Sequence, residues 1–234
     1  MGAGAALTGI ALAGCADSMV HPGDSFPDPT KDSSDPEETA RPTTFVAYGD
    51  SLTAGHRRSL AFGLPPTDTW LGYAGSGLVW AGGAAVSGAT ARALQAMLTP
   101  TPQAEYGIYF FGTNDRLRGR SVEAMVADIT AAHDSIPASR RPKHPCLVAV
   151  GPQGSAASTT AVDTWNTEVR LSAEELGWGY LDPWGQLRAT AVAGGTGQWA
   201  SAGIHRDRLH PTEDGAKLLG AGMAAALEAL DQKK

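Results

Sequence analysis

Cysteine is scarce in this 234-residue sequence, and there is no stripe of basic residues. With only two cysteines, Cys15 and Cys146, the chain cannot be a disulfide-rich scaffold. Cys146 lies in an apolar run at 146–150 and is expected to be a small core residue. The formal net charge is -6, and basic residues gather only in the short groups 56–58 and 140–141, as on an ordinary solvated surface. A nucleic acid is therefore not an expected partner.

Long hydrophobic runs are also missing, because the N-terminal apolar stretch at 5–13 is too short to span a bilayer. It runs into Leu12-Ala13-Gly14-Cys15, which resembles the lipobox of bacterial lipoproteins, although residues 1–8 lack the Lys or Arg of a usual signal. In lipoproteins the signal is cleaved before the cysteine, whose sulfur is then lipidated. We interpret residues 1–15 as a signal and anchor segment that holds an exported protein on the outer face of a bacterial membrane through Cys15. The alternatives are a secreted protein and an incidental cysteine in an apolar N-terminus.

Residues 16–43 have few large apolar side chains and many prolines and acidic residues. Such a segment cannot bury enough surface to offset its ordering entropy, so we expect a disordered linker. From residue 44 to 234, strand-like runs alternate with helix-like stretches, which predicts one domain built as a three-layer α/β/α sandwich. The expected strands are at 44–48, 78–81, 106–111, 146–151 and 178–182. The clearest expected helices are at 121–136, at 160–176 and after Pro211-Thr212.

Two common catalytic patterns are absent from the sequence. No G-x-S-x-G elbow occurs, which argues against the common α/β-hydrolase arrangement. The histidines lack the paired spacing of a zinc site. We expect His133, on a predicted helix, and His144, next to prolines, to lie on the surface.

Polar segments follow the expected strands, and in an α/β sheet such segments meet at one edge. Ser51, in Gly49-Asp50-Ser51-Leu52, follows the first strand, and Ser87-Gly88-Ala89-Thr90 follows the second. Gly112-Thr113-Asn114-Asp115 follows the third, and Asp207-Arg208-Leu209-His210 comes just before the last helix. Together they supply a hydroxyl nucleophile, an imidazole base, an orienting acid and donors for an oxyanion, which are the parts that acyl transfer through serine requires.

These four blocks, in this order, resemble the SGNH superfamily of GDSL-type esterases and lipases. The resemblance implies a flavodoxin-like fold with a five-stranded parallel sheet. It implies that Ser51 is the nucleophile, His210 the general base and Asp207 the acid that orients it. It also implies an oxyanion hole formed by the Ser51 N–H, the Gly88 N–H and the Asn114 side chain, with no metal or cofactor.

Several neighbouring residues have two interpretations. Where the family often has a glycine after the acid, this chain has Arg208, which either binds an anionic substrate group or points to solvent. Trp199, in a glycine-rich loop, is a candidate wall for an acyl chain or sugar. His205 competes with His210 for the role of base, but it has no carboxylate three residues upstream. Asp50 and Asp115 each lie next to a residue with an implied catalytic role. Each is expected to stabilise its turn by accepting backbone N–H bonds.

The sequence thus predicts a serine esterase that acts on a small-molecule, lipid or carbohydrate ester, and a monomer is expected. It does not distinguish short acyl esters of carbohydrates, lysophospholipid-type esters and thioesters. An acyltransferase would share the same residues and differ in the acceptor. A catalytically inactive binding protein on the same fold is the remaining alternative.

Overall fold

The computed structural model describes residues 42–55, 57, 59–60, 68–75, 77–151, 156–185, 187, 203–204 and 207–232, without the side chains of 156–159. The expected anchor segment and most of the expected linker lie outside these residues. The described strands form one sheet in the order β2-β3-β1-β4-β5-β6. Their bounds are β1 Thr43–Gly49, β2 Ser59–Leu60, β3 Leu78–Val86, β4 Tyr106–Phe110, β5 His144–Val148 and β6 Gly179–Leu181.

Five of these strands are parallel, and their order is the flavodoxin-like one that the resemblance implied. The sixth, β2, was not predicted: it pairs antiparallel with the end of β3 through Ser59–Val86 and Leu60–Ala85. Two residues are too short a run to show any periodicity in a sequence. The α/β/α sandwich is therefore confirmed, with one short antiparallel edge strand added.

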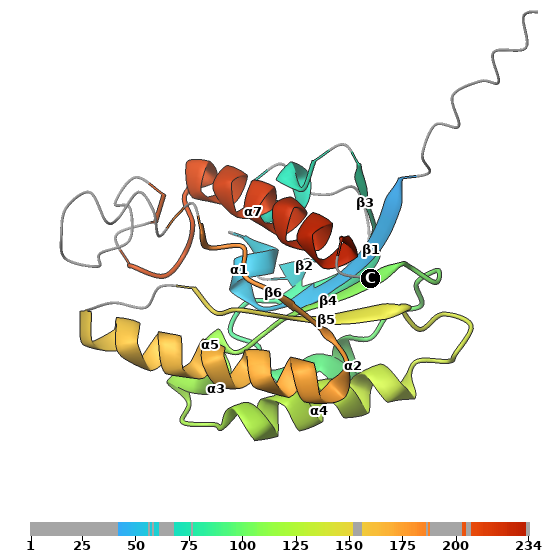
Figure 1. Cartoon of the computed structure of the whole chain (residues 1–234), viewed down its shortest axis with the longest axis horizontal. Coiled ribbons are helices and arrows are strands. Elements are labelled where there is room, and N and C mark those ends of the chain that lie inside the picture. Colours follow the sequence, from blue (N-terminus) through green and yellow to red (C-terminus); the bar gives the residue numbers. More distant parts are fainter. Residues whose placement is uncertain are drawn as a thin grey trace, which may run out of the picture. The chain divides into compact units, whose positions relative to one another are not determined.

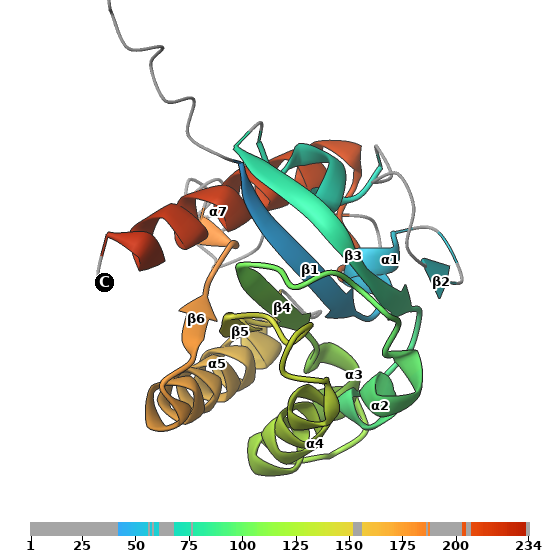
Figure 2. The same ribbon diagram turned by 90° about the vertical axis from the view of Figure 1, so that its right-hand side faces the viewer.

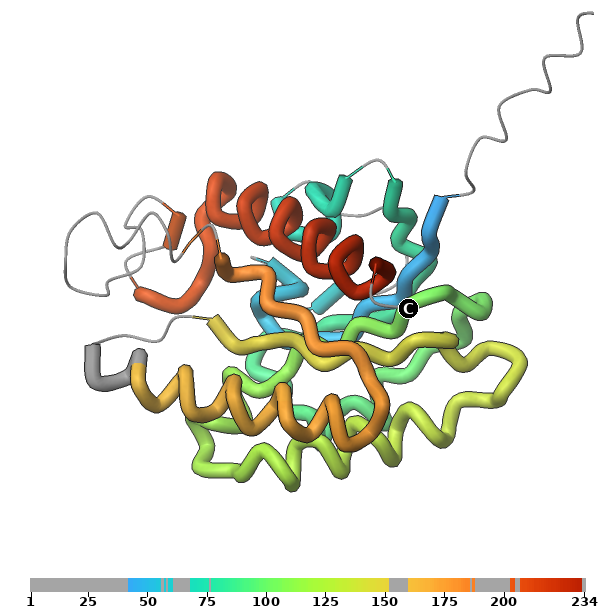
Figure 3. Tube along the Cα trace, viewed as in Figure 1, coloured from blue at the N-terminus to red at the C-terminus, as the bar shows by residue number. Residues whose placement is uncertain are grey.

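Helices cover both faces of the sheet, as Figures 1 and 2 show. The helix α7 (Glu213–Asp231) lies on one face, and α4 (Val122–Ser135) and α5 (Ala156–Leu176) lie on the other. The shorter helices are α1 (Ser51–Ala54), α2 (Leu94–Met97) and α3 (Thr113–Leu117), with 3-10 turns at Trp70–Tyr73 and Ala91–Ala93. The tube in Figure 3 shows the last helix running back across the sheet, above the strands that begin the domain.

The core divides into two clusters because successive side chains of a strand point to opposite faces. In β1, Phe45 and Ala47 pack on the α7 side, while Val46 and Tyr48 pack on the side of α4 and α5. All four are essentially buried. Cys146 is buried in the first cluster, which confirms its predicted core position.

Strand β3 is longer than the expected 78–81 because small residues carry it on to Val86. A Cβ on Gly83, whose φ is +120°, would lie 1.9 Å from the Ala47 carbonyl oxygen of β1. Only glycine allows this close approach. The sequence did not predict this extension, because Gly82-Gly83-Ala84-Ala85 lacks the bulky apolar side chains by which strands are identified.

His133 is buried, so its expected surface position is wrong. Its Nδ1 lies 2.8 Å from the Tyr109 hydroxyl, and its ring packs edge-on against Trp178. Burial lowers the pKa of His133 below its usual value. Its hydrogen-bond partner, Tyr109, belongs to β4, so the spacing of residues within the helix could not predict this contact.

Candidate active site

Ser51 stands at the carboxyl edge of the sheet, directly after β1. Asp50 caps α1, and its Oδ1 accepts the Leu52 N–H at 2.9 Å. Ser51 is therefore the first residue of a four-residue helix, with 9% of its surface exposed. A side chain at this position faces outward from the sheet edge while its backbone is fixed by the cap.

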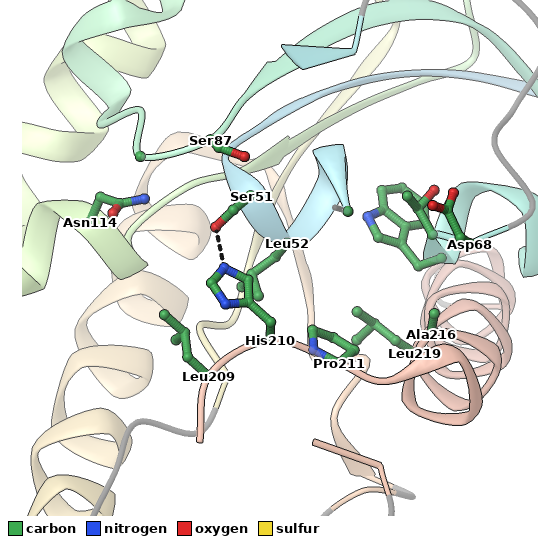
Figure 4. Close-up of a pocket in the computed structure, with 14 residues that line it drawn as sticks. Ser51, Leu52, Asp68, Ser87, Asn114, Leu209, His210, Pro211, Ala216 and Leu219 are labelled. Carbon is green, nitrogen blue, oxygen red and sulfur yellow. Dashed lines mark hydrogen bonds between the residues drawn. The ribbon is translucent and has the colours of Figure 1, made fainter. Parts of the chain in front are cut away.

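A chain of hydrogen bonds joins Ser51 to His210 and Asp207 (Figure 4). His210 Nε2 lies 2.8 Å from Ser51 Oγ, and His210 Nδ1 lies 2.7 Å from Asp207 Oδ2. The other carboxylate oxygen of Asp207 accepts the backbone N–H groups of Leu209 and His210, each at 3.0 Å. Partial burial acts to raise the pKa of Asp207, but the bonds from His210 and Leu209 outweigh it and leave that pKa below its usual value. The carboxylate is thus kept ionised beside the imidazole.

The start of α7 holds His210 in place. Thr212 caps this helix, since its Oγ1 accepts the Gly215 N–H at 3.1 Å. The Thr212 N–H in turn donates to the Gly203 carbonyl at 3.0 Å, and Pro211 pairs with Ile204 in an isolated bridge. These contacts fix the backbone immediately after the imidazole.

Three candidate hydrogen-bond donors belong to residues that line the cavity at Ser51. Within the described part of the chain, neither the Ser51 N–H nor the Gly88 N–H donates to another protein group. Gly88 has a φ of +79°, a conformation that favours glycine, and it lines the same cavity as Ser51 and Asn114. Asn114 donates one amide hydrogen to Asp50 Oδ2 at 3.0 Å, which leaves its second hydrogen for a ligand. An oxyanion could therefore receive three bonds here.

Asp50 connects α1 to Asn114, a contact that the sequence did not reveal. Its expected turn contact is confirmed by the bond from Leu52, but its second oxygen is bound by Asn114 on α3. The side chain is fully buried. Burial raises the pKa of Asp50 to about 7, against the opposing effect of the bonds from Leu52 and Asn114. The site thus contains a carboxyl group that is costly to ionise.

The loop that carries Gly88 is attached to the end of β4 by two side chains. Asp115, also fully buried, accepts the Ala91 N–H and forms an ion pair with Arg120 at 2.9 Å. Arg118 donates from a guanidinium nitrogen to the Gly88 carbonyl at 2.8 Å. The sequence predicted that Asp115 would stabilise its own turn. In the structure its side chain joins this turn to the segment at Ala91.

A cavity of about 360 Å³ lies over Ser51. Its wall on the α7 side is largely apolar, and it contains Leu52, Trp70, Pro211, Ala216 and Leu219. In Figure 4, Asn114 and Asp68 lie on opposite sides of Ser51. A substrate carbonyl at Ser51 would therefore have the donors on one side and an apolar pocket on the other.

Comparison with protein families decides the identity of the chain. The model of the GDSL-like Lipase/Acylhydrolase family matches residues 47–218. The chain belongs to this family. It is therefore a GDSL-type carboxylic ester hydrolase, as the four blocks predicted. A search of curated proteins found no match.

Solved structures with the same fold include other hydrolases. A catalytic mutant of an acetylxylan esterase from Geobacillus stearothermophilus is 18% identical, with 79% of this chain and 94% of that chain covered and a TM-score of 0.59. The aryl esterase of M. smegmatis is 17% identical, with 80% and 99% covered and a TM-score of 0.56. A member of the lipolytic protein G-D-S-L family from Veillonella parvula is 17% identical, with 81% and 99% covered and a TM-score of 0.55. At these identities the likeness shows a shared fold.

The remaining predicted residues of this GDSL-like hydrolase lie as follows. Arg208 is exposed, has a left-handed backbone with a φ of 58°, and is not among the described residues that line the cavity. Trp199, His205 and Cys15 lie outside the described residues. In the part of the chain that the structure describes, no group of acidic, His or Cys side chains could hold a metal ion. No helix in that part is both long and apolar enough to cross a bilayer.

Proposed function

We propose that the protein hydrolyses carboxylic esters through a covalent acyl-enzyme on Ser51. The observation that carries this proposal is the hydrogen-bonded chain Ser51–His210–Asp207, beside a cavity that Gly88 and Asn114 also line. His210 Nε2 would take the proton from Ser51 Oγ as that oxygen attacks the ester carbonyl carbon. Asp207 would hold the imidazole in the tautomer that this step needs and stabilise the imidazolium that results.

The negative charge that develops on the carbonyl oxygen would be bound by the Ser51 N–H, the Gly88 N–H and the Asn114 amide. Each such donor is typically worth about 3 kcal/mol of barrier. His210 would then return its proton to the leaving alcohol oxygen. Water, deprotonated by the same imidazole, would attack the acyl carbon and release the acid, which restores Ser51.

We further propose that the substrate is a small ester with a short acyl chain. Ligand pockets commonly enclose about 300–1,000 Å³, so the cavity of about 360 Å³ is at the small end. The apolar residues near Leu219 favour a compact acyl group there. Among the solved structures with this fold is an acetylxylan esterase, which supports a short acyl group.

A fluorophosphonate probe tests the nucleophile. The wild-type protein should be labelled, and Ser51→Ala should not. Ser87→Ala is the matched control, because Ser87 also lines the cavity but bonds the Arg57 carbonyl instead of an imidazole. Absence of labelling in the folded wild type, or equal labelling of Ser51→Ala, would overturn the proposal.

A panel of para-nitrophenyl esters from acetyl to palmitoyl tests the substrate class. The value of kcat/KM should be highest for the shortest chains and should fall as the acyl chain outgrows the cavity. A palmitoyl preference would contradict the short-chain proposal while leaving the nucleophile assignment intact. Added alcohols would expose acyl transfer, since a transferase would form the new ester in preference to the free acid.

For location we propose an exported protein that is held to the outer face of a bacterial membrane by a lipid on Cys15. The support is the segment Leu12-Ala13-Gly14-Cys15 followed by an acidic, proline-rich stretch. Mass analysis of membrane-extracted protein should show a diacyl or triacyl group on Cys15. An unmodified Cys15 in that protein would contradict the proposal.

A further inference from the structure

Arg118 lies beside the cavity, at the end of the helix that carries Asn114. It follows α3 as its C-cap, and its N–H donates to the Asn114 carbonyl at 3.1 Å, so the two residues are one helical turn apart. Its guanidinium donates to the Gly88 carbonyl at 2.8 Å. A Cβ at Gly88 would lie 3.9 Å from the same guanidinium nitrogen. The cation therefore stands next to a residue that lines the cavity.

The charge of Arg118 is not balanced by a carboxylate in the described chain. Several other arginines are paired: Arg57 with Asp68, Arg120 with Asp115 and Asp128, Arg141 with Asp134, and Arg170 with Glu174. The acid on its own helix, Asp115, is buried and already bound by Arg120 and the Ala91 N–H. Arg118 itself is exposed to solvent.

The guanidinium also has donors to spare. Arginine carries five N–H groups in a planar fork, and a single bond to a neutral carbonyl leaves the outward edge of that fork unused. That bond restrains the long side chain, so a ligand would lose less conformational freedom in binding it. A fixed fork with an unpaired charge is suited to a carboxylate or a phosphate.

The cavity has a different character on its other side. Asp68, which pairs with Arg57, and the apolar residues near Leu219 lie across Ser51 from Asn114 (Figure 4). A substrate bound at Ser51 would therefore meet an apolar wall on one side. On the other side, a part of it that extends past Gly88 would reach the Arg118 cation, which bonds the Gly88 carbonyl from outside the lining of the cavity. This asymmetry favours an ester with one compact apolar part and one anionic part.

We infer that Arg118 forms an anion-binding subsite and that the preferred substrate is a small ester bearing a carboxylate or a phosphate. This inference rests on the proposed esterase function of the same cavity. Arg118 bonds the anion and selects the substrate. It takes no part in the bond-breaking steps.

The test compares charged and neutral esters of similar size. The neutral reference is methyl para-acetoxybenzoate. The charged substrates are para-acetoxybenzoate and para-acetoxyphenyl phosphate, with the charge on the alcohol part, and a para-nitrophenyl hemisuccinate, with the charge on the acyl part. In Arg118→Gln, the ratio of charged to neutral kcat/KM should fall about tenfold for at least one of the three. The substrate affected identifies the anion and the side of the ester that carries it.

The substitution to glutamine is chosen because its amide can still donate to the Gly88 carbonyl. If Arg118 only positions the Gly88 loop, the charged and neutral substrates will lose the same factor, and the inference is wrong. Arg118→Lys, which keeps the charge without the fork, should retain part of the preference. The control is Arg140→Gln, which removes the same charge before β5, at the opposite edge of the sheet, and should leave the ratio unchanged.

Salt provides a second measurement that needs no variant. In the wild type, the ratio of charged to neutral kcat/KM should fall between low salt and about 0.5 M NaCl, because an exposed ion pair is screened. If the ratio of charged to neutral kcat/KM changes neither with salt nor in Arg118→Gln, the proposed anion-binding subsite is wrong. If the wild type cleaves no ester and takes no fluorophosphonate label, the esterase proposal itself has failed, which is a separate result.

Discussion

Position 208 has an arginine where the backbone is left-handed, with a φ of 58°. The turn needs this conformation because Asp207 accepts the N–H groups of both Leu209 and His210. A left-handed residue other than glycine costs roughly 1–2 kcal/mol. Arg208→Gly should therefore be at least as stable as the wild type, while Arg208→Val, which adds β-branching, should lower the free energy of unfolding by about 1–2 kcal/mol.

Urea denaturation of the three proteins measures this difference. Equal stability of the glycine and valine variants would show that the turn relaxes without cost. The result bears on function because strain in this turn is held beside the imidazole, as backbone strain often is at functional sites.

Asp207 offers a second prediction at the scale of the residue. Asp207→Asn should lower kcat on the order of ten thousandfold, because the amide would hold the wrong imidazole tautomer. Folding should survive, since the asparagine oxygen can still accept the N–H bonds of Leu209 and His210. Steady-state kinetics together with circular dichroism test both halves. An unchanged kcat would mean that another acid orients His210.

At the scale of the element, two helix caps allow a matched comparison. Thr212 caps α7 two residues after His210, whereas Ser121 caps α4 through its bond from the Ala124 N–H. Loss of either cap should lower the free energy of unfolding by about 1 kcal/mol. Only Thr212→Ala should also lower kcat, because only that cap fixes the backbone next to the imidazole.

Thermal or urea unfolding and kcat, measured on Thr212→Ala and Ser121→Ala, separate stability from positioning. Similar losses of kcat in both variants would show that general loosening of the fold, and not the start of α7, sets the activity.

At the scale of the whole molecule, Asp50 affects how stability depends on pH. Its pKa is about 7 in the folded protein and 3.8 in the unfolded reference, so the folded state binds the extra proton between these values. The contribution of Asp50 is therefore fully present below about pH 4 and is lost as the pH rises through about 7. The asparagine in Asp50→Asn cannot ionise. The free energy of unfolding of this variant should therefore increase relative to that of the wild type as the pH rises from about 4.5 to 7.5.

The same variant should lose kcat, because Asn114 would lose the carboxylate that holds its amide. Asp163→Asn, an exposed carboxylate on α5, is the control and should show a difference from the wild type that stays constant with pH. A constant difference for Asp50→Asn as well would mean that Asp50 is ionised at similar pH in both states.

Much of this architecture could be predicted from the sequence, because alternating apolar runs and polar blocks are local signals. The helix expected at 121–136 is present, and its apolar residues at three- and four-residue spacing, Val122, Met125, Val126 and Ile129, are buried. The bond between Asp50 and Asn114 could not be predicted, since it joins residues that lie 64 positions apart and only the order of the strands brings them together. Arg118 was missed for the same reason, because its contact with Gly88 joins the segment after α3 to the segment after β3.

The bond between Ser51 and His210 links residues 159 positions apart, one just after the first described strand and the other just before the last described helix. A nascent chain that has made every strand but not α7 would carry the nucleophile without its base. Under the proposed mechanism, hydrolytic activity would therefore appear only after α7 has packed on the sheet. By the same logic, local opening of α7 alone would silence the enzyme while the sheet stays intact. Turnover by that mechanism would require both the segment after β1 and the segment before α7 to be folded.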